Sequence, residues 1–326
     1  MAKNSNLHAA KSAKNDEFYT QLVDIENELR HYKDHFKGKV VYCNCDDAQE
    51  SNFFKYFSLN FEHLGLKKLI TSCYNENGKG KYLVYEGDKN GNSMPDPDEI
   101  GIFEFEGNGD FRSAESIELL KEADIVVSNP PFSKFRECIA QLVEYQKKFL
   151  VIGNMNAITY KEIFPLIKEN KIWCGYGFNL SMVYRTPYEN NLESNAKFVI
   201  SKGYDPKHHV KVPAVCWFTN LEHDKRNEEL VLYRTYNEQD YPKYDNYDAI
   251  EVSNVKEIPC DYSGIMGVPI TFLGKYNPKQ FEILGLSASA GYNKEIVGIP
   301  FIGQKDARCL INNKNVYARI LIKKLA

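Results

Sequence analysis

The residues with the clearest chemical potential form the run Ser128-Asn129-Pro130-Pro131-Phe132, which directly follows the β-branched segment DIVV. A residue before proline is held in an extended conformation, and each proline fixes φ and removes an N–H donor. The loop is therefore stiff and presents acceptors, namely the Asn129 side-chain oxygen and the Pro130 carbonyl. Each can accept one hydrogen from an exocyclic NH2 group, which stabilises the positive charge that forms as the nitrogen attacks an electrophile. Phe132 can stack on a planar ring.

A Pro-Pro turn that only ends a strand would contain the same residues, so the surrounding elements bear on the interpretation. Short apolar, β-branched segments alternate with amphipathic ones along the first two thirds of the chain. This alternation predicts strands at residues 39–44, 67–73, 102–105, 123–127, 148–153, 172–174 and 212–220. It predicts helices at residues 16–36, 53–61, 113–121, 135–145 and 160–169, with Thr20 capping the first and Ser51 or Asn52 the second. Residues 75–101 are rich in Gly, Asn and Pro and predict an inserted hairpin or loop.

These elements predict an α/β fold with a doubly wound, mostly parallel sheet. The alternation stops near residue 220, where a stretch rich in Tyr, Asp and Asn begins soon afterwards. We therefore expect two domains, a larger one over residues 1–220 that carries the candidate chemistry and a smaller one over residues 221–326.

In an open α/β sheet, ligands bind at the carboxyl ends of the strands, so the polar loops after the predicted strands are candidate binding sites. Cys45-Asp46-Asp47 follows the first of these strands and precedes a helix start, a place suited to a polar ligand. No G-x-G-x-x-G motif occurs there, so a dinucleotide-phosphate clamp is not supported. Asp110-Phe111 offers an acceptor and an aromatic ring, which suit an adenine amine. A helix cap or a solvated turn explains Asp110 equally well.

Composition narrows the class of protein. The chain has 326 residues, of which 43% are apolar and 26% charged, with a net charge of -3. This composition is typical of a globular protein and excludes a disordered tail, a collagen-like chain or a small disulfide scaffold. No apolar run reaches the roughly 20 residues of a membrane helix, and the N-terminus lacks the apolar core of a signal peptide, so we expect a cytoplasmic protein. The eight cysteines form no C-x-x-C pair, which favours free thiols over a metal site.

Basic residues gather in three places despite the negative net charge. Residues 1–15 contain three lysines and no acid, residues 207–211 form the run KHHVK, and residues 305–326 contain six basic residues and one acid. A solvated surface explains each cluster by itself, yet a negative net charge does not exclude a local basic stripe that binds nucleic acid.

The sequence resembles the EcoRI-type adenine-specific DNA methyltransferases over nearly its whole length. The segments that carry the resemblance, in order, are DEFYTQ (16–21), VVYCNCDD (40–47), SNFFKYF (51–57), GDFRS (109–113), SNPPFS (128–133), ITYKEIF (158–164), PKYDNYDAI (242–250) and MGVPITFL (266–273). NPPF alone is shared widely among amino-methyltransferases, and the other segments are more specific. The resemblance implies the class I, Rossmann-like fold of S-adenosylmethionine-dependent methyltransferases, with a C-terminal domain that recognises DNA.

By this resemblance, the N-terminal segment and the loops after the strands hold S-adenosylmethionine, and the NPPF loop holds the target adenine. The implied cofactor-binding residues are Phe18, Tyr19, Thr20, Cys45, Asp46, Asp47, Glu76, Asp110, Phe111 and Asn129. The implied catalytic residues are Asn129, Pro130, Pro131 and Phe132. CNCDD departs from the usual glycine-rich loop, and Glu76 is the candidate partner of the cofactor ribose.

The implied reaction is direct methyl transfer to adenine N6, with neither a covalent enzyme intermediate nor a metal ion. Because the target base lies inside double-stranded DNA, it must first be flipped out of the stack. We expect a monomer that serves restriction–modification or protective methylation, paired in function with a restriction endonuclease or acting without one, and in no stable complex. Two alternatives remain open: an NPP-type methyltransferase acting on RNA adenine or protein glutamine, and a catalytically idle DNA-binding relative.

Overall fold

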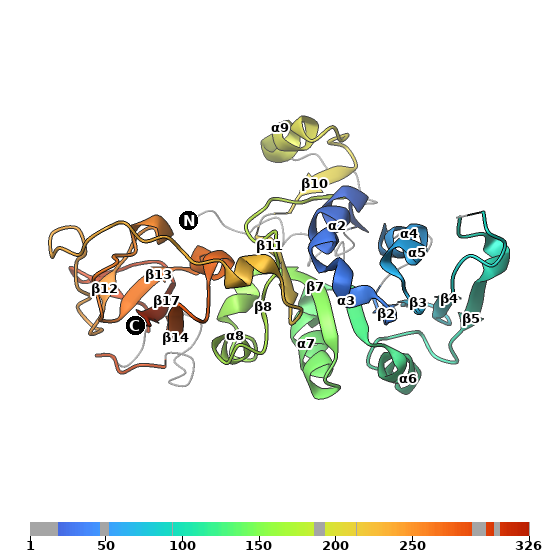
Figure 1. Cartoon of the computed structure of the whole chain (residues 1–326), viewed down its shortest axis with the longest axis horizontal. Helices are drawn as coiled ribbons and strands as arrows, with labels where there is room; N and C mark the ends of the chain where they lie inside the picture. The colour runs from blue at the N-terminus through green and yellow to red at the C-terminus, as the bar shows by residue number, and fades with distance from the viewer. Residues whose placement is uncertain are drawn as a thin grey trace. The chain divides into compact units, whose positions relative to one another are not determined.

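The computed structural model of the chain describes residues 19–45, 52–92, 94–185, 193–212, 214–288, 298–302 and 307–325 (Figure 1). The chain divides into two compact units, each built from two separate stretches of sequence. The first unit comprises Met1–Asn154 and Leu180–Leu221, and the second comprises Met155–Asn179 and Glu222–Ala326. Residues 155–179 therefore group with the C-terminal part of the chain.

The first unit is built on a mixed sheet with a parallel centre. Its strands, in spatial order, are β5 (Ile100–Glu104), β4 (Lys81–Tyr85), β3 (Lys68–Cys73), β2 (Val40–Cys43), β6 (Ile125–Ser128), β7 (Lys148–Asn154) and β11 (Val215–Thr219). Strand β2 pairs in parallel with β3 and β6, and β6 pairs in parallel with β7. Strands β2 and β6 are buried at every position, as expected of parallel strands covered on both faces. The predicted doubly wound, mostly parallel sheet is confirmed.

Helices cover both faces of this sheet, with α2 and α4 on one side and α6 and α7 on the other (Figure 1). The helices of the unit are α2 (Leu22–Leu29), α3 (Lys33–Phe36), α4 (Asn52–Leu59), α5 (Phe61–Leu64), α6 (Ala114–Glu122), α7 (Phe135–Glu144) and α9 (Glu193–Ser201). Helix α6 begins as predicted, since the Ser113 side chain accepts a hydrogen bond from the Ser116 N–H.

The predicted single helix over residues 16–36 is wrong in two respects. The helical segment begins at Leu22 and is interrupted by a 3-10 turn at Arg30–Tyr32. Its N-cap is Gln21, which makes no side-chain capping bond. Thr20 cannot serve as the cap because it belongs to the short strand β1 (Tyr19–Thr20), which pairs with β9 (Val183–Arg185). Strand β10 (His209–Lys211) completes this small sheet.

The edge of the main sheet differs from the predicted βα alternation. The inserted hairpin predicted within residues 75–101 contains β4, which turns back antiparallel to β3. The strand predicted at 102–105 is β5, and it returns antiparallel to β4. The expectation that it continues the parallel sheet is therefore wrong, because β4 takes the position beside β3.

The described part of the second unit contains a smaller sheet and one short two-stranded pairing. Its main sheet has the order β12 (Ile250–Glu251), β13 (Met266–Pro269), β17 (Arg319–Lys324) and β14 (Phe281–Ser287), and β15 (Leu310–Ile311) pairs with β16 (Lys314–Asn315). This unit also contains β8 (Trp173–Cys174) and α8 (Phe164–Lys168). Helix α8 is shorter than the predicted 160–169. Gly267 permits the close approach of Tyr244, since an added Cβ would lie 2.2 Å from the Tyr244 hydroxyl.

The C-terminal basic cluster does not lie on one surface. Arg319 is buried in the second unit and forms an ion pair with Glu251, with a shortest N–O distance of 2.6 Å. Tyr244 and Ser253 donate further hydrogen bonds to the same carboxylate. Arg319 therefore cannot belong to a basic surface stripe that binds nucleic acid. No helix in the described part of the chain is long and apolar enough to span a membrane.

Candidate functional site

Two buried side-chain oxygens without partners mark the carboxyl edge of the parallel strands. Strands β2 and β6 pair with Tyr42 opposite Val126. Two residues further along, Asn44 and Ser128 therefore lie at the same level and on the same face. The Asn44 Oδ1 and Ser128 Oγ atoms are buried and have no hydrogen-bond partner among the residues that the structure describes. Buried polar atoms are nearly always paired, so these two indicate a place for a ligand with donor groups.

Thr20 carries a third buried side-chain oxygen of this kind. Its hydroxyl oxygen is buried and has no partner in the described part of the chain, and its carbonyl accepts a hydrogen bond of 2.8 Å from the Asn52 side chain. Asn52 is the first residue of α4, the helix that follows the Cys45-Asp46-Asp47 loop. The structure thus ties the N-terminal segment to the start of that helix.

The remaining predicted residues of these two segments can be placed only in part. Phe18, Asp46 and Asp47 lie outside the described residues, and of Tyr19 only the backbone, in β1, is described. Cys45 lies half-buried in the turn directly after β2.

The Ser128–Phe132 loop leaves the sheet at the end of β6 and turns tightly into a 3-10 segment at Phe132–Lys134. Asn129 and Phe132 are half-buried, Pro130 is buried and Pro131 is exposed. The Pro131 carbonyl accepts the Lys134 N–H at 2.8 Å. No backbone N–H of the described residues donates to the Pro130 carbonyl. It therefore keeps the acceptor capacity that the sequence predicts for it.

Tight packing holds helix α7, which follows this loop, against the sheet. Phe135, the first residue of α7, is buried against Gly153 on β7. A Cβ at Gly153 would lie 2.4 Å from the Phe135 ring, so only glycine allows this approach. The position of the loop is thus set by close contacts on its C-terminal side as well as by its prolines.

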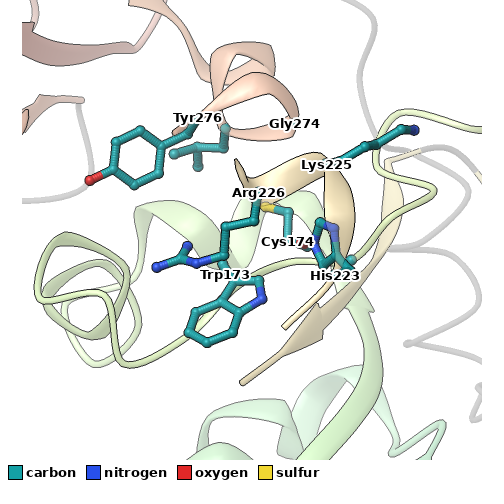
Figure 2. A pocket seen from close by; sticks show the side chains of 9 residues that line it. Trp173, Cys174, His223, Lys225, Arg226, Gly274 and Tyr276 are labelled. Carbon is teal, nitrogen blue, oxygen red and sulfur yellow. Dashed lines mark hydrogen bonds between the residues drawn. The ribbon is translucent and has the colours of Figure 1, made fainter. Parts of the chain in front are cut away.

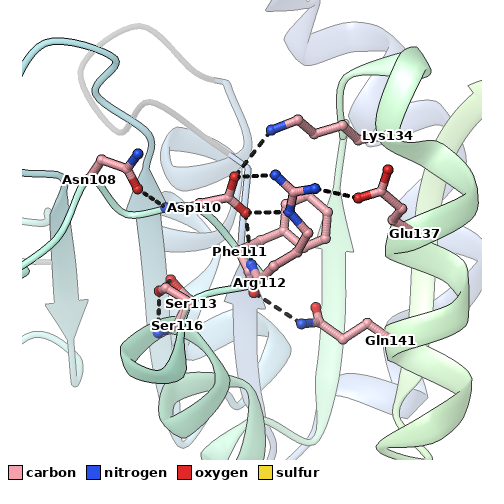
Figure 3. A network of polar contacts seen from close by, with 9 residues as sticks. All are labelled: Asn108, Asp110, Phe111, Arg112, Ser113, Ser116, Lys134, Glu137 and Gln141. Atoms are coloured by element: carbon pink, nitrogen blue, oxygen red, sulfur yellow. Dashed lines mark hydrogen bonds and ion pairs between the residues drawn. The ribbon is translucent and has the colours of Figure 1, made fainter.

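Asp110 lies in a network of charged groups that links two loops (Figure 3). Its Oδ1 accepts from the Arg112 Nε at 2.9 Å, and its Oδ2 accepts from the Arg112 Nη2 at 2.7 Å and from the Lys134 Nζ at 3.1 Å. These hydrogen bonds, led by Arg112, hold the pKa of Asp110 well below its usual range. With the Arg112 N–H as a fourth donor, the carboxylate has filled its acceptor positions. Asp110 therefore fastens its own loop to the end of the NPPF loop.

The loop after β3 also contacts the loops that the Asp110 network joins. The Asn75 N–H donates to the Asn108 carbonyl at 2.9 Å. Gly109 has φ of +76°, and a Cβ there would lie 2.5 Å from the Cys73 carbonyl oxygen, so glycine is needed for both reasons. The loop after β3 also contacts Lys134, whose Nζ lies 5.5 Å from the centroid of the Tyr74 ring. The loops after β3, β5 and β6 therefore meet at one edge of the sheet.

Of the other predicted residues, Phe111 is buried beside this network, with the Arg112 guanidinium 5.6 Å from its ring centroid. Glu76 is exposed in the turn after β3. Sequence reasoning missed Asn44, Arg112 and Lys134. A signal was present for each, because Asn44 lies within VVYCNCDD and the two cations directly follow GDF and NPPFS.

A pocket in the second unit is too small to be a substrate site (Figure 2). Its cavity is about 10 Å³, close to the space of one water molecule. The Arg226 guanidinium lies 3.8 Å from the Trp173 ring centroid, and His223 contacts the Cys174 carbonyl oxygen at 3.1 Å. Burial lowers the pKa of His223. These contacts hold residues 173–174 against the segment that begins at residue 222.

The chain matches a known family along almost its entire length. A family profile described as "Adenine-specific methyltransferase EcoRI" matches residues 6–325. The type II methyltransferase M.EcoRI of Escherichia coli is 50% identical, with 99% of this chain and 97% of that protein covered.

The chain belongs to the EcoRI family of adenine-specific methyltransferases.

Two mycoplasma proteins extend the comparison. The type II methyltransferase M.MgeORF184P of Mycoplasma genitalium is 40% identical, with 98% of each chain covered. The type II methyltransferase M.MpnI of Mycoplasma pneumoniae is 44% identical, with 87% of this chain and 86% of that protein covered. No solved structure matches the chain. The resemblance drawn from the sequence segments is confirmed, as is the prediction of an adenine-specific methyltransferase.

Proposed function

We propose that this methyltransferase transfers a methyl group from S-adenosylmethionine to the N6 amine of an adenine flipped out of duplex DNA. The observation that carries the proposal is the NPPF loop at the carboxyl edge of the parallel strands. Asn129 would accept one N6 hydrogen at its side-chain oxygen, and the Pro130 carbonyl would accept the other. Both bonds strengthen as the nitrogen gains positive charge, which is the condition for lowering the barrier. Phe132 would stack on the extruded ring.

The residues near this loop fit the proposed cofactor. When bound, S-adenosylmethionine supplies an electrophilic methyl group on a sulfonium. It also carries an ammonium group, ribose hydroxyls and an adenine amine, all of which donate hydrogen bonds. The unpartnered oxygens of Thr20, Asn44 and Ser128 provide acceptors for such donors. We propose that Phe18, Tyr19, Cys45, Asp46, Asp47 and Glu76 complete the cofactor site and that Asn129 borders it. Phe111, held by the Asp110 network, would form one wall of the pocket for the adenine ring of the cofactor.

The proposed reaction needs no proton acceptor of unusual strength. The Asn129 and Pro130 oxygens bind the amine hydrogens throughout methyl transfer, and the methylated amine then loses one proton to water. The attacking electron pair comes from the base, so no enzyme nucleophile is required. The C-terminal unit would supply the contacts to duplex DNA, and we propose that the protein acts as a monomer in restriction–modification or protective methylation. A partner endonuclease, where one exists, would act on the same DNA sites without a stable complex.

An Asn129→Ala variant tests the proposal. We expect methyl transfer to duplex DNA to fall by about 10²-fold or more, as when a preorganised polar group is removed from other active sites. Cofactor affinity, measured by calorimetry, should change little. The matched control is Asn60→Ala, because Asn60 is also half-buried and its side chain makes one hydrogen bond to a backbone carbonyl away from the site. This control should keep full activity.

Labelled cofactor offered with duplex DNA, RNA or protein identifies the substrate. Incorporation into duplex DNA at adenine N6 is expected for the wild type. Label only in RNA or only in protein glutamine would contradict the proposed substrate. Cofactor binding without any transfer would favour a catalytically idle relative. Loss of both cofactor binding and transfer in Asn129→Ala would assign that residue a structural role instead.

A further inference from the structure

A small hairpin in the second unit presents a row of polar side chains that its own fold does not use. Strands β15 and β16 are joined by Asn312 and Asn313, which have φ of 50° and 60°. Two successive residues with positive φ form the tight turn that suits a two-residue hairpin loop, and asparagine is one of the residues that tolerates it. Residues 312–315 are all exposed, and Tyr317 is 84% exposed.

The base of the hairpin is fixed firmly, in contrast to its exposed tip. The buried Asn246 side chain accepts the Leu310 N–H and donates to the Arg308 carbonyl, both at 2.9 Å. Asp245 bonds the hairpin twice, through its N–H to the Leu310 carbonyl at 2.8 Å and through its carboxylate to the Asn313 N–H at 2.7 Å. Rigid support of this kind is what a recognition element requires.

The core of the unit continues into this base. Ala307 and Cys309 are buried in a cluster with Tyr244, Tyr247 and Leu321, and the partly buried Ile311 and Val316 pack against that cluster. One face of the hairpin therefore packs against the core. The turn residues extend beyond it, and within the described residues their side chains form no hydrogen bond or ion pair.

The chemistry of the tip matches the edges of bases. Residues 312–315 read Asn-Asn-Lys-Asn, so the tip combines amides with one cation. An asparagine amide can form a bidentate pair with adenine N6 and N7, and a lysine can donate to guanine O6 and N7. The major groove of B-DNA admits a two-stranded β-ribbon, and the antiparallel pairing of β15 with β16 is such a ribbon. The carboxylate of Asp245, which is bonded to the turn, accepts a hydrogen bond from the Asn313 N–H.

We infer that the β15–β16 hairpin enters the major groove of the DNA substrate and reads bases through Asn312, Asn313, Lys314 and Asn315. This inference rests on the proposed action on duplex DNA and adds which surface of the second unit selects the sequence.

The test compares the wild type with the double variant Asn312→Gly/Asn313→Gly. Glycine accepts the positive φ of both positions, so the turn is kept while both amides are lost. A Lys314→Ala variant removes the cation at the tip. The matched control is Lys323→Ala, an exposed lysine on β17 of the same unit. Each protein is expressed in a host without its own DNA methylation, and methylated adenines are mapped across the genome by single-molecule sequencing.

We expect the wild type and Lys323→Ala to methylate one short motif. The glycine double variant should methylate near-cognate sites that differ from this motif at one position, with discrimination reduced by about tenfold or more for each lost bidentate contact. Cofactor affinity should be unchanged, because no residue of the hairpin belongs to the proposed cofactor site. A double variant that keeps the wild-type motif and rate would overturn the inference while leaving the proposed function intact. Absence of methyladenine with the wild type would overturn both.

Discussion

Removing one partner of the buried ion pair between Arg319 and Glu251 should cost more stability than breaking any other charged contact described in the second unit. The Arg319 side chain is 11% exposed and that of Glu251 is 6% exposed. The Arg319 Nε lies 3.1 and 3.0 Å from the two carboxylate oxygens, and its Nη2 lies 2.6 Å from one of them. Replacing Arg319 by Met keeps much of the side-chain volume but leaves the Glu251 carboxylate buried without a cation.

Removing one partner of a buried pair costs about 3–5 kcal/mol in other proteins, because the remaining charge is not compensated. The hydrogen bonds that Tyr244 and Ser253 donate to Glu251 persist in the variant, so we expect the lower half of that range, about 3–4 kcal/mol. The double variant Arg319→Met/Glu251→Gln should recover much of the loss, because the uncompensated charge is gone.

Urea unfolding followed by near-ultraviolet circular dichroism measures these differences. The matched control is Lys323→Met, since Lys323 lies on the same strand and is exposed. It should change the free energy of unfolding by no more than about 0.5 kcal/mol. If Arg319→Met costs no more than Lys323→Met, the ion pair contributes nothing measurable and the reasoning is refuted. A double variant as unstable as the single one would show that packing, rather than charge, accounts for the loss.

Two further predictions concern Asp110 and Gly267. Because the pKa of Asp110 is lowered by Arg112 and Lys134, its stabilising effect is fully present above the unfolded pKa of about 3.9 and is lost as the pH falls through the lowered value. The difference in unfolding free energy between wild type and Asp110→Asn should thus stay constant from about pH 8 to 5 and shrink below about pH 4. Urea titrations at each pH measure this difference. A difference that stays constant down to pH 2 would contradict the assigned cause. Gly267→Ala places a Cβ 2.2 Å from the Tyr244 hydroxyl, so it should lower the free energy of unfolding by about 1–3 kcal/mol. Urea unfolding measures this change. An unchanged urea midpoint would mean that Tyr244 moves aside without cost.

Local sequence predicts the centre of the fold well. The runs VVYC and DIVV are apolar and β-branched throughout, and the structure places them as β2 and β6, buried on both faces. The stiffness of the NPPF loop follows from its two prolines, whose restrictions act within one or two residues. The helix predicted at residues 113–121 is α6, and Ser113 caps it through a bond that spans only three residues.

Pairing between distant segments is less predictable. The sequence of β5 indicates a strand but not its direction, which depends on β4 occupying the position beside β3. Thr20 has the chemistry of a helix cap, yet its pairing with Tyr184 holds it in a strand. The grouping of residues 155–179 with the C-terminal part of the chain likewise has no local signal.

The sequence by itself determined the order of the central elements, the stiff NPPF loop and the family, since these depend on residue types within short segments. Only the tertiary structure decided which polar groups bond to other groups of the fold and which keep free acceptor positions. Arg319 looks like a surface cation in the sequence, but it pairs with Glu251, which lies 68 residues away. Asn44 and Ser128 look ordinary, but their side-chain oxygens are buried and no described residue bonds to them. Both outcomes depend on desolvation and on neighbours from distant segments, which no local pattern records.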